Sequence, residues 1–182
     1  CTAPEKGEMW YISKWDADGG DNTIVKVNGD TVFEVLPVAK IGDVDYKKLQ
    51  KAIDAAQNDE TITLLRDCGE NVTITQKADV KFTIDGAQQI MTGAITVDGK
   101  SATIMSAGVT IKNVKFNANN ITTEAAINLG VKGDNNTRYT CNVTVESCTF
   151  TGTSQAKAAV KSYTGGDKNL TITNCTVDAT MH

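Results

Sequence analysis

The sequence predicts an all-β fold in which short strands stack in successive coils, and one repeated segment carries most of this prediction. Residues 109–116, 143–150 and 170–177 align without gaps. Each reads apolar, Thr, apolar, polar, Asn or Ser, apolar, polar, apolar, which is the alternation of two half-buried strands with one extra polar residue between them. Such a unit buries its apolar face only by stacking on its neighbours, so the sequence predicts a short parallel β-helix.

The extra polar residue of each repeat is predicted to form a corner between two strands. It is Asn113, Ser147 or Asn174, and these side chains bond nearby backbone, while Asn also tolerates a left-handed φ. On either side of the corner, apolar residues of successive coils should stack in the core. Three stacks are expected: Val109 with Val143 and Leu170, Val114 with Cys148 and Cys175, and Phe116 with Phe150 and Val177. The stacked cysteines are therefore interpreted as core residues.

The spacing of matching residues gives the length of one coil. Ile111 lies 27 residues after Ile84, and Ile172 lies 27 residues after Val145. The interval from Ile111 to Val145 is 34 residues, and the polar run 132–139 accommodates the excess as a protruding loop. A second apolar ladder halfway around the coil predicts three strands per coil, and it comprises residues 94–97, 125–127 and 158–160.

An amphipathic helix is predicted before the first coil, over about residues 45–57, with Asp45 as its capping residue. Its apolar stripe consists of Tyr46, Leu49, Ile53 and Ala56. The first strand follows at residues 61–65. A helix in this place would shield the open end of the stack from edge-to-edge pairing.

Residues 1–38 are predicted to form a small β appendage, and residues 39–182 to form the β-helix, with coils over 61–181. In the appendage, residues 22–27 and 31–35 flank Asn28-Gly29, a strong hairpin signal, and residues 8–12 are a possible third strand. At the other end, the chain stops on a stacking strand. We therefore expect a C-terminally truncated piece of a longer protein.

The composition excludes two classes of partner. The net charge is −4 and the only arginines are Arg66 and Arg138, so the sequence offers no basic stripe for nucleic acid. No stretch approaches the roughly 20 apolar residues that cross a bilayer, so no membrane insertion of this segment is expected. Cys1 would suit a lipid-anchored chain, a chain boundary or an unpaired thiol, and the disulfide state stays open.

Residues 38–65 resemble the beginning of pectin-lyase-like right-handed parallel β-helix domains in large surface proteins of gut bacteria, particularly Firmicutes. The segments Asn-Val-Thr-Val at 142–145 and Asn-Leu-Thr-Ile-Thr-Asn-Cys-Thr at 169–176 are similar to their coils. The resemblance implies a right-handed helix and an extracellular location on the bacterial cell surface. It says little about activity, because function depends on sites rather than on the fold.

The residues do not supply the catalytic groups of the polysaccharide lyases and glycoside hydrolases that the resemblance implies as relatives. Polysaccharide lyases of this class imply clustered Asp ligands for calcium, and glycoside hydrolases need two opposed carboxylates. The outward positions of the aligned coils are instead Thr110, Thr144 and Thr171, then Lys112, Glu146 and Thr173, then Lys115, Thr149 and Thr176. His182 is the only histidine. We therefore predict no enzyme, no catalytic residue and no cofactor.

No metal site is predicted either. The five cysteines lack CxxC spacing, which argues against zinc. Residues 16–21 have the acidic spacing of part of a calcium loop but lack its final bidentate Glu, so a solvated turn is the preferred interpretation. The Asn-x-Ser/Thr triplets, including those at Asn142 and Asn169, are attributed to Thr-rich strands between Asn turns rather than to glycosylation.

The sequence therefore favours a non-catalytic binding or adhesion module that recognises a host protein. Secreted immunoglobulin is suggested by ecological analogy, and a protein is preferred over a glycan because no aromatic platform decorates the coils. The candidate binding residues are Lys112, Lys115 and Glu146 on the coils and Trp10, Tyr11 and Trp15 in the appendage, where the aromatics could equally be its core. A fragment of a carbohydrate-active enzyme and a structural stalk spacer are the alternatives. The outward threonines are attributed to β-propensity, with Lys112 and Glu146 interrupting their array.

Overall fold

The computed structural model describes residues 11–12, 24–27, 30–34, 36–76, 79–98, 108–130, 141–152, 157–163 and 168–178. The chain divides into two compact units, residues 1–37 and 38–182. Several predicted features lie outside the described residues: Trp10, Trp15, the acidic turn at 16–21, the Asn28-Gly29 turn and the loop at 132–139.

The first unit contains a three-stranded antiparallel sheet in the order β1 (Tyr11–Ile12), β2 (Ile24–Val27), β3 (Asp30–Glu34). Strands β2 and β3 pair on either side of Asn28-Gly29, with Val25 opposite Phe33. Strand β1 adds to β2, with Tyr11 opposite Lys26. These pairings confirm the predicted hairpin and its third strand.

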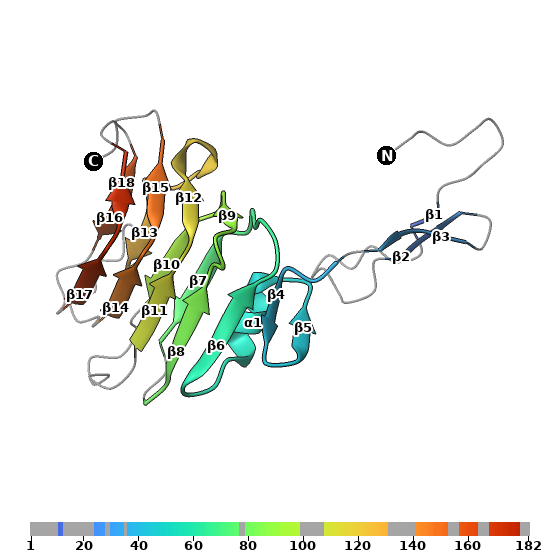
Figure 1. Cartoon of the computed structure of the whole chain (residues 1–182), viewed down its shortest axis with the longest axis horizontal. Helices are drawn as coiled ribbons and strands as arrows, with labels where there is room; N and C mark the ends of the chain where they lie inside the picture. The colour runs from blue at the N-terminus through green and yellow to red at the C-terminus, as the bar shows by residue number, and fades with distance from the viewer. Residues whose placement is uncertain are drawn as a thin grey trace. The chain divides into compact units, whose positions relative to one another are not determined.

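The second unit is mostly β, with parallel strands in three sheets and one α-helix (Figure 1). We call β16-β13-β10-β7 the first four-stranded sheet and β18-β15-β12-β9 the second four-stranded sheet; the seven-stranded sheet has the order β17-β14-β11-β8-β6-β4-β5. The parallel strands are β6 (Glu60–Leu64), β7 (Val72–Thr75), β8 (Lys81–Asp85), β9 (Ile90–Met91), β10 (Ile95–Asp98), β11 (Gly108–Lys112), β12 (Lys115–Asn117), β13 (Ala125–Leu129), β14 (Cys141–Glu146), β15 (Thr149–Thr151), β16 (Ala158–Ser162), β17 (Lys168–Thr173) and β18 (Thr176–Val177).

The chain visits these sheets in a fixed order. It passes from the seven-stranded sheet through the second four-stranded sheet and then the first, and returns to the seven-stranded sheet one strand further on, as in the succession β8, β9, β10, β11. A short 3-10 helix, η1 (Ala118–Asn120), interrupts the next round between β12 and β13. The inward side chains of all three sheets join in one hydrophobic core.

The predicted register is confirmed in every aligned repeat. Val109 pairs with Val143 and Val143 with Leu170, while Phe116 pairs with Phe150 and Phe150 with Val177. The 27-residue intervals are also matched, because Ile84 lies beside Ile111 and Val145 beside Ile172. Leu170 departs from the expected burial: it is 39% exposed, against 3% for Val109 and Val143, because it lies in the edge strand β17.

The predicted corners adopt left-handed backbone. The φ angles of Asn113, Ser147 and Asn174 are 54°, 52° and 54°. A non-glycine residue in this region costs about 1–2 kcal/mol, and Asn tolerates it best. The recurrence of Asn or Ser immediately after β11, β14 and β17 is therefore a backbone requirement rather than a binding signature.

The core cysteines behave as buried thiols. Cys148 is buried, and this burial raises the pKa of its thiol to about 11. Burial likewise raises the pKa of Cys68. Both thiols therefore stay protonated near neutral pH. Cys175, the next member of the predicted stack, is half-buried.

The helix prediction was right in kind and wrong at its start. Helix α1 spans Leu49–Ala55, with Lys48 rather than Asp45 at the N-cap position and no side-chain cap there. Asp45 and Tyr46 belong to β5 (Val44–Tyr46), which forms an antiparallel hairpin with β4 (Ala39–Ile41). Strand β4 in turn pairs antiparallel with β6 and so extends the seven-stranded sheet. Over only three residues, the apolar pattern of a strand cannot be distinguished from that of the first turn of a helix.

The start of α1 is capped from a distant part of the chain. Leu49 N–H donates to Glu70 Oε1 at 2.9 Å, and Gln50 N–H donates to Glu70 Oε2 at 3.3 Å. A carboxylate at this position satisfies free backbone donors and interacts favourably with the helix dipole. Glu70 therefore joins the helix to the segment that leads into β7.

Candidate functional site

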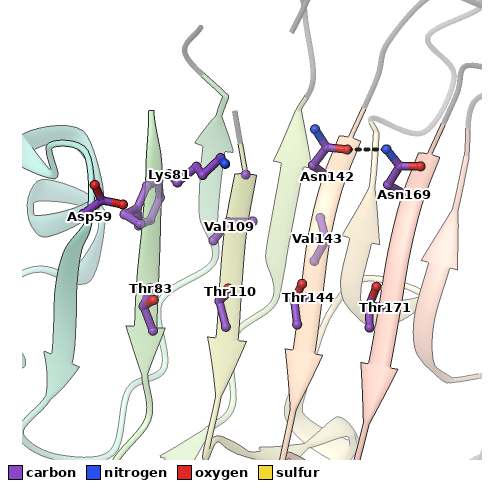
Figure 2. Close-up of a pocket in the computed structure, with 12 residues that line it drawn as sticks. Asp59, Lys81, Thr83, Val109, Thr110, Asn142, Val143, Thr144, Asn169 and Thr171 are labelled. Carbon is purple, nitrogen blue, oxygen red and sulfur yellow. Dashed lines mark hydrogen bonds between the residues drawn. The ribbon is translucent and has the colours of Figure 1, made fainter. Parts of the chain in front are cut away.

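A groove of about 470 Å³ lies on the outward face of the seven-stranded sheet, where β8, β11, β14 and β17 begin (Figure 2). Because parallel strands run in one direction, their first residues meet at the same end of the sheet. The lining residues are Asp59, Lys81, Phe82, Thr83, Gly108, Val109, Thr110, Asn142, Val143, Thr144, Asn169 and Thr171.

A row of threonines crosses the sheet beneath this groove. Thr61, Thr83, Thr110, Thr144 and Thr171 are in register on five neighbouring strands, and we call them the threonine row. Figure 2 shows the side chains of Thr83, Thr110, Thr144 and Thr171 in a line across the strands. Neighbouring strands are spaced by about 4.8 Å, so the row presents hydroxyl groups at that repeat. Each hydroxyl both donates and accepts a hydrogen bond.

Lys112 and Glu146 interrupt the outward threonines in the neighbouring row and not in this one. Both residues lie two positions further along their strands, where they pair with each other. They therefore form a separate row with Asp85 and Thr173. Because side chains of one face recur every second residue, a charged residue at that position leaves the threonine row continuous.

A second row borders the groove two residues before the threonines. It consists of Asp59, Lys81, Gly108, Asn142 and Asn169, and we call it the Gly108 row. Asn169 Nδ2 donates to Asn142 Oδ1 at 2.8 Å, which links the two amides in a ladder (Figure 2). Asp59 and Lys81 place one carboxylate and one ammonium at the other end. The groove thus combines a nearly neutral charge with many hydrogen-bonding groups.

Gly108 leaves a hollow in the middle of its row. An added Cβ would meet Asn142 no closer than 3.8 Å and Lys81 no closer than 3.9 Å. This is ordinary van der Waals contact, so the backbone does not require glycine here. The missing side chain gives the groove depth between its two polar ends.

Gln76 holds the start of β14 in place. Its Nε2 donates to Asn142 O at 3.1 Å, and its Oε1 accepts from Asn142 N–H at 3.3 Å. Gln76 is buried and comes from the end of β7 in the first four-stranded sheet. Its amide therefore positions the groove residue Asn142 in the way that a neighbouring strand would.

The row beyond the threonines contains an ion pair across two rounds of the chain. Lys112 Nζ lies 3.4 Å from Asp85 Oδ2. Burial acts to raise the pKa of Asp85, but hydrogen bonds from Ala87 N–H at 3.0 Å and Asn113 Nδ2 at 3.1 Å, together with Lys112, outweigh it. The pKa of Asp85 is therefore lowered, and its carboxylate also fixes the side chain of the corner residue Asn113.

Replacing Asp85 with Asn is expected to lower the free energy of unfolding by about 1 kcal/mol near neutral pH, because the charged acceptor is lost. Since the folded-state pKa of Asp85 lies below its unfolded value of about 3.9, this contribution is present above about pH 4 and is lost as the pH falls through the folded value. Urea unfolding across this range measures it, with the exposed Asp43→Asn as the control for charge. A difference that does not change with pH contradicts the prediction.

The structure brings together only part of the predicted site. Lys112 and Glu146 are neighbours, whereas the exposed Lys115 lies beyond the Asn113 corner, in the second four-stranded sheet. Tyr11 lies in β1 of the first unit, and Trp10 and Trp15 fall outside the described residues. Their roles in binding stay predictions.

Sequence analysis identified the outward threonines of three repeats but missed the groove beside them. The signal was available two residues upstream, where Gly108, Asn142 and Asn169 occupy one aligned position. Two of these residues had been explained as chance Asn-x-Thr triplets. The row is recognisable only when the alignment is extended beyond the apolar repeat.

Comparison with protein-family models, curated proteins and solved structures gives no match to this chain. Among the residues that the structure describes, no group of three or more His, Cys, Asp or Glu side chains could hold a metal ion. No helix in the same part of the chain is long and apolar enough to span a bilayer.

Proposed function

We propose that this chain is a non-catalytic binding module of a bacterial cell-surface protein, and that its groove holds an extended segment of a host protein. The scaffold proposed for it is a short right-handed parallel β-helix, in which the three sheets are the faces of successive coils. The observation that carries the proposal is the continuous threonine row beside the Gly108 hollow.

The chemistry of the groove supports a polypeptide ligand. An extended backbone alternates N–H donors with C=O acceptors, and hydroxyls and amides can match both. The Asn142–Asn169 amide ladder and the threonine row supply such groups on a fixed sheet, while the hollow above Gly108 has room for a side chain. Backbone contacts would give affinity and the hollow would give specificity.

Secreted immunoglobulin is the host protein proposed first, because its variable domains are β-sandwiches with accessible framework strands. This choice follows from the resemblance to surface proteins of gut bacteria. A location on the bacterial surface, facing host secretions, would bring the two proteins together.

A larger side chain at Gly108 tests whether the groove is the binding site. Purified secretory immunoglobulin is passed over the immobilised chain. Proteins captured from whole host secretions are also identified, and the binding of each is then measured in purified form. Gly108→Leu should weaken binding about tenfold or more, equivalent to roughly 1.4 kcal/mol, and Gly108→Ala should weaken it less. Because an added Cβ fits without a clash, Gly108→Ala should not lower the melting temperature. The melting temperature of Gly108→Leu is measured beside it, so that a loss of binding is distinguished from a loss of folding.

Lys51→Leu is the matched control, since it adds the same side chain at an exposed position of α1. If Gly108→Leu binds the host protein as tightly as the unchanged chain, the groove is not the binding site. Failure to capture any host protein would favour the stalk spacer. Polysaccharide cleavage by the chain would favour the enzyme alternative.

A further inference from the structure

A second pocket, of about 420 Å³, lies on the outward face of the first four-stranded sheet. It is lined by Thr96, Thr122, Thr123, Glu124, Asn128, Gly130 and Tyr163. Thr96 pairs with Asn128 across β10 and β13. Both alternate with core residues such as Ile127, so their side chains point away from the core. This site is on a different sheet from the groove and does not depend on the function proposed for it.

Asn128, which lines this pocket, carries a buried hydrogen-bond acceptor. Asn128 is only 2% exposed. Its Nδ2 donates to Ala125 O at 3.1 Å and to Thr123 Oγ1 at 3.4 Å. Because a carbonyl oxygen can only accept, Ala125 fixes which end of the amide is the donor. Oδ1 therefore faces the other way, and within the described chain it has no hydrogen-bond partner.

A buried acceptor without a donor is unfavourable and calls for an explanation. The hydrogen bonds of Nδ2 to Ala125 and Thr123 explain one half of the amide within the fold, but they leave Oδ1 without a role. A ligand that donates a hydrogen bond to Oδ1 accounts for the amide and for the pocket together.

The charges around the pocket favour a neutral ligand. The Glu124 carboxylate is paired with Lys161 Nζ and accepts from the Tyr163 hydroxyl at 3.4 Å. Lys157 Nζ donates to Ile121 O at 2.8 Å and to Thr123 O at 2.6 Å. Lys161 therefore offsets the charge of Glu124, and Lys157 adds a second ammonium group beside the segment 121–123. A cationic ligand would be repelled by the two ammonium groups, and an anionic ligand would meet Glu124 and the acceptor of Asn128.

Tyr163 gives the pocket an aromatic wall, which the sequence had not suggested for the coils. Lys161 Nζ lies 5.3 Å from the centroid of its ring, an attractive cation–π distance that helps to hold the ring in place. Small-ligand sites commonly combine an aromatic surface with a few placed polar groups in a pocket of roughly 300–1,000 Å³. Threonine hydroxyls from Thr96 and Thr122 complete this combination.

We propose that this pocket binds a neutral saccharide unit, whose hydroxyl donates to Asn128 Oδ1 while its ring lies against Tyr163. A saccharide carries several hydroxyls that both donate and accept, which matches an amide oxygen, a carboxylate and threonines at once. The chain would then recognise a glycan in addition to the protein segment proposed for the groove.

Nuclear magnetic resonance of the isotope-labelled chain tests this directly. Glucose, galactose, mannose, fucose, N-acetylglucosamine and N-acetylgalactosamine are titrated one at a time into the millimolar range. At least one should shift the Asn128 side-chain amide and the Tyr163 ring signals to saturation. Asn128→Ala and Tyr163→Ala should each weaken that binding about tenfold or more, whereas the exposed Lys51→Ala should not.

Two results would overturn the proposal. One is that none of the six sugars shifts the Asn128 amide. The other is that the shifts are confined to the Asn142 and Asn169 amides, which would assign the sugar to the groove. Tyr163→Ala changes a half-buried residue beyond the end of β16, so it remains informative if Asn128→Ala does not fold. A negative result here leaves the Gly108 experiment unaffected.

Discussion

Replacing Gly93 with Ala is expected to lower the free energy of unfolding by about 3 kcal/mol or more, because nothing near the new methyl group can give way. Its Cβ would lie 1.8 Å from Glu70 O and 2.3 Å from Glu70 C. These are backbone atoms of the preceding round, so the backbone at Gly93 or at Glu70 must move. The movement would also disturb Asn71, whose Oδ1 accepts from Ala94 N–H at 2.9 Å.

Gly69→Ala is the matched control for this substitution. Its Cβ would meet Thr92 Oγ1 at 3.3 Å, and that side-chain oxygen can rotate away. Urea unfolding compares the two variants, and hydrogen exchange of the Leu49 and Gln50 amides reports whether displaced Glu70 releases α1. Equal stability of the two alanine variants would mean that the rounds are not in close backbone contact at Gly93.

The sequence was sufficient for the repeating part of the fold because the repeat carries its own register. The aligned apolar positions predicted which residues neighbour each other, such as Ile111 beside Val145, and the corner at Asn113 followed from its backbone preference. Its limit was the non-repeating start. Asp45 reads as a cap by local rules, yet Glu70, distant in sequence, satisfies the free donors of α1. A long-range carboxylate leaves no local signal.

The candidate sites were less accessible to sequence reasoning, for a physical reason. The groove depends on the absence of a side chain at Gly108, and apolar periodicity does not register an absence. The second pocket depends on Asn128, whose surroundings come from the segment before β13 and from Tyr163 after β16. A residue can be recognised as an orphaned acceptor only when its neighbours in space are known.

The largest core effect is expected at the aromatic pair in the second four-stranded sheet. Phe116 and Phe150 are both 1% exposed, and their rings stack with centroids 5.1 Å apart and an interplanar angle of 5°. Met91 and Val177 continue the same stack on either side. Either Phe→Ala substitution is expected to cost about 3–5 kcal/mol. Phe116→Ala should be the more damaging, because Val177 beside Phe150 is 46% exposed and leaves more room to relax.

The coupling between the two rings is better measured with leucine than with alanine. Two alanine substitutions would remove most of the roughly 5–15 kcal/mol that holds a typical domain folded, so the double variant could not be compared. In a cycle of Phe116→Leu, Phe150→Leu and both, urea unfolding should give a coupling of about 0.5–1.5 kcal/mol, the usual value of an aromatic pair beyond its buried area. Strictly additive losses would mean that the rings only fill space. A positive coupling would show that contact between the rings of successive rounds adds to the stabilisation that burial of each ring provides.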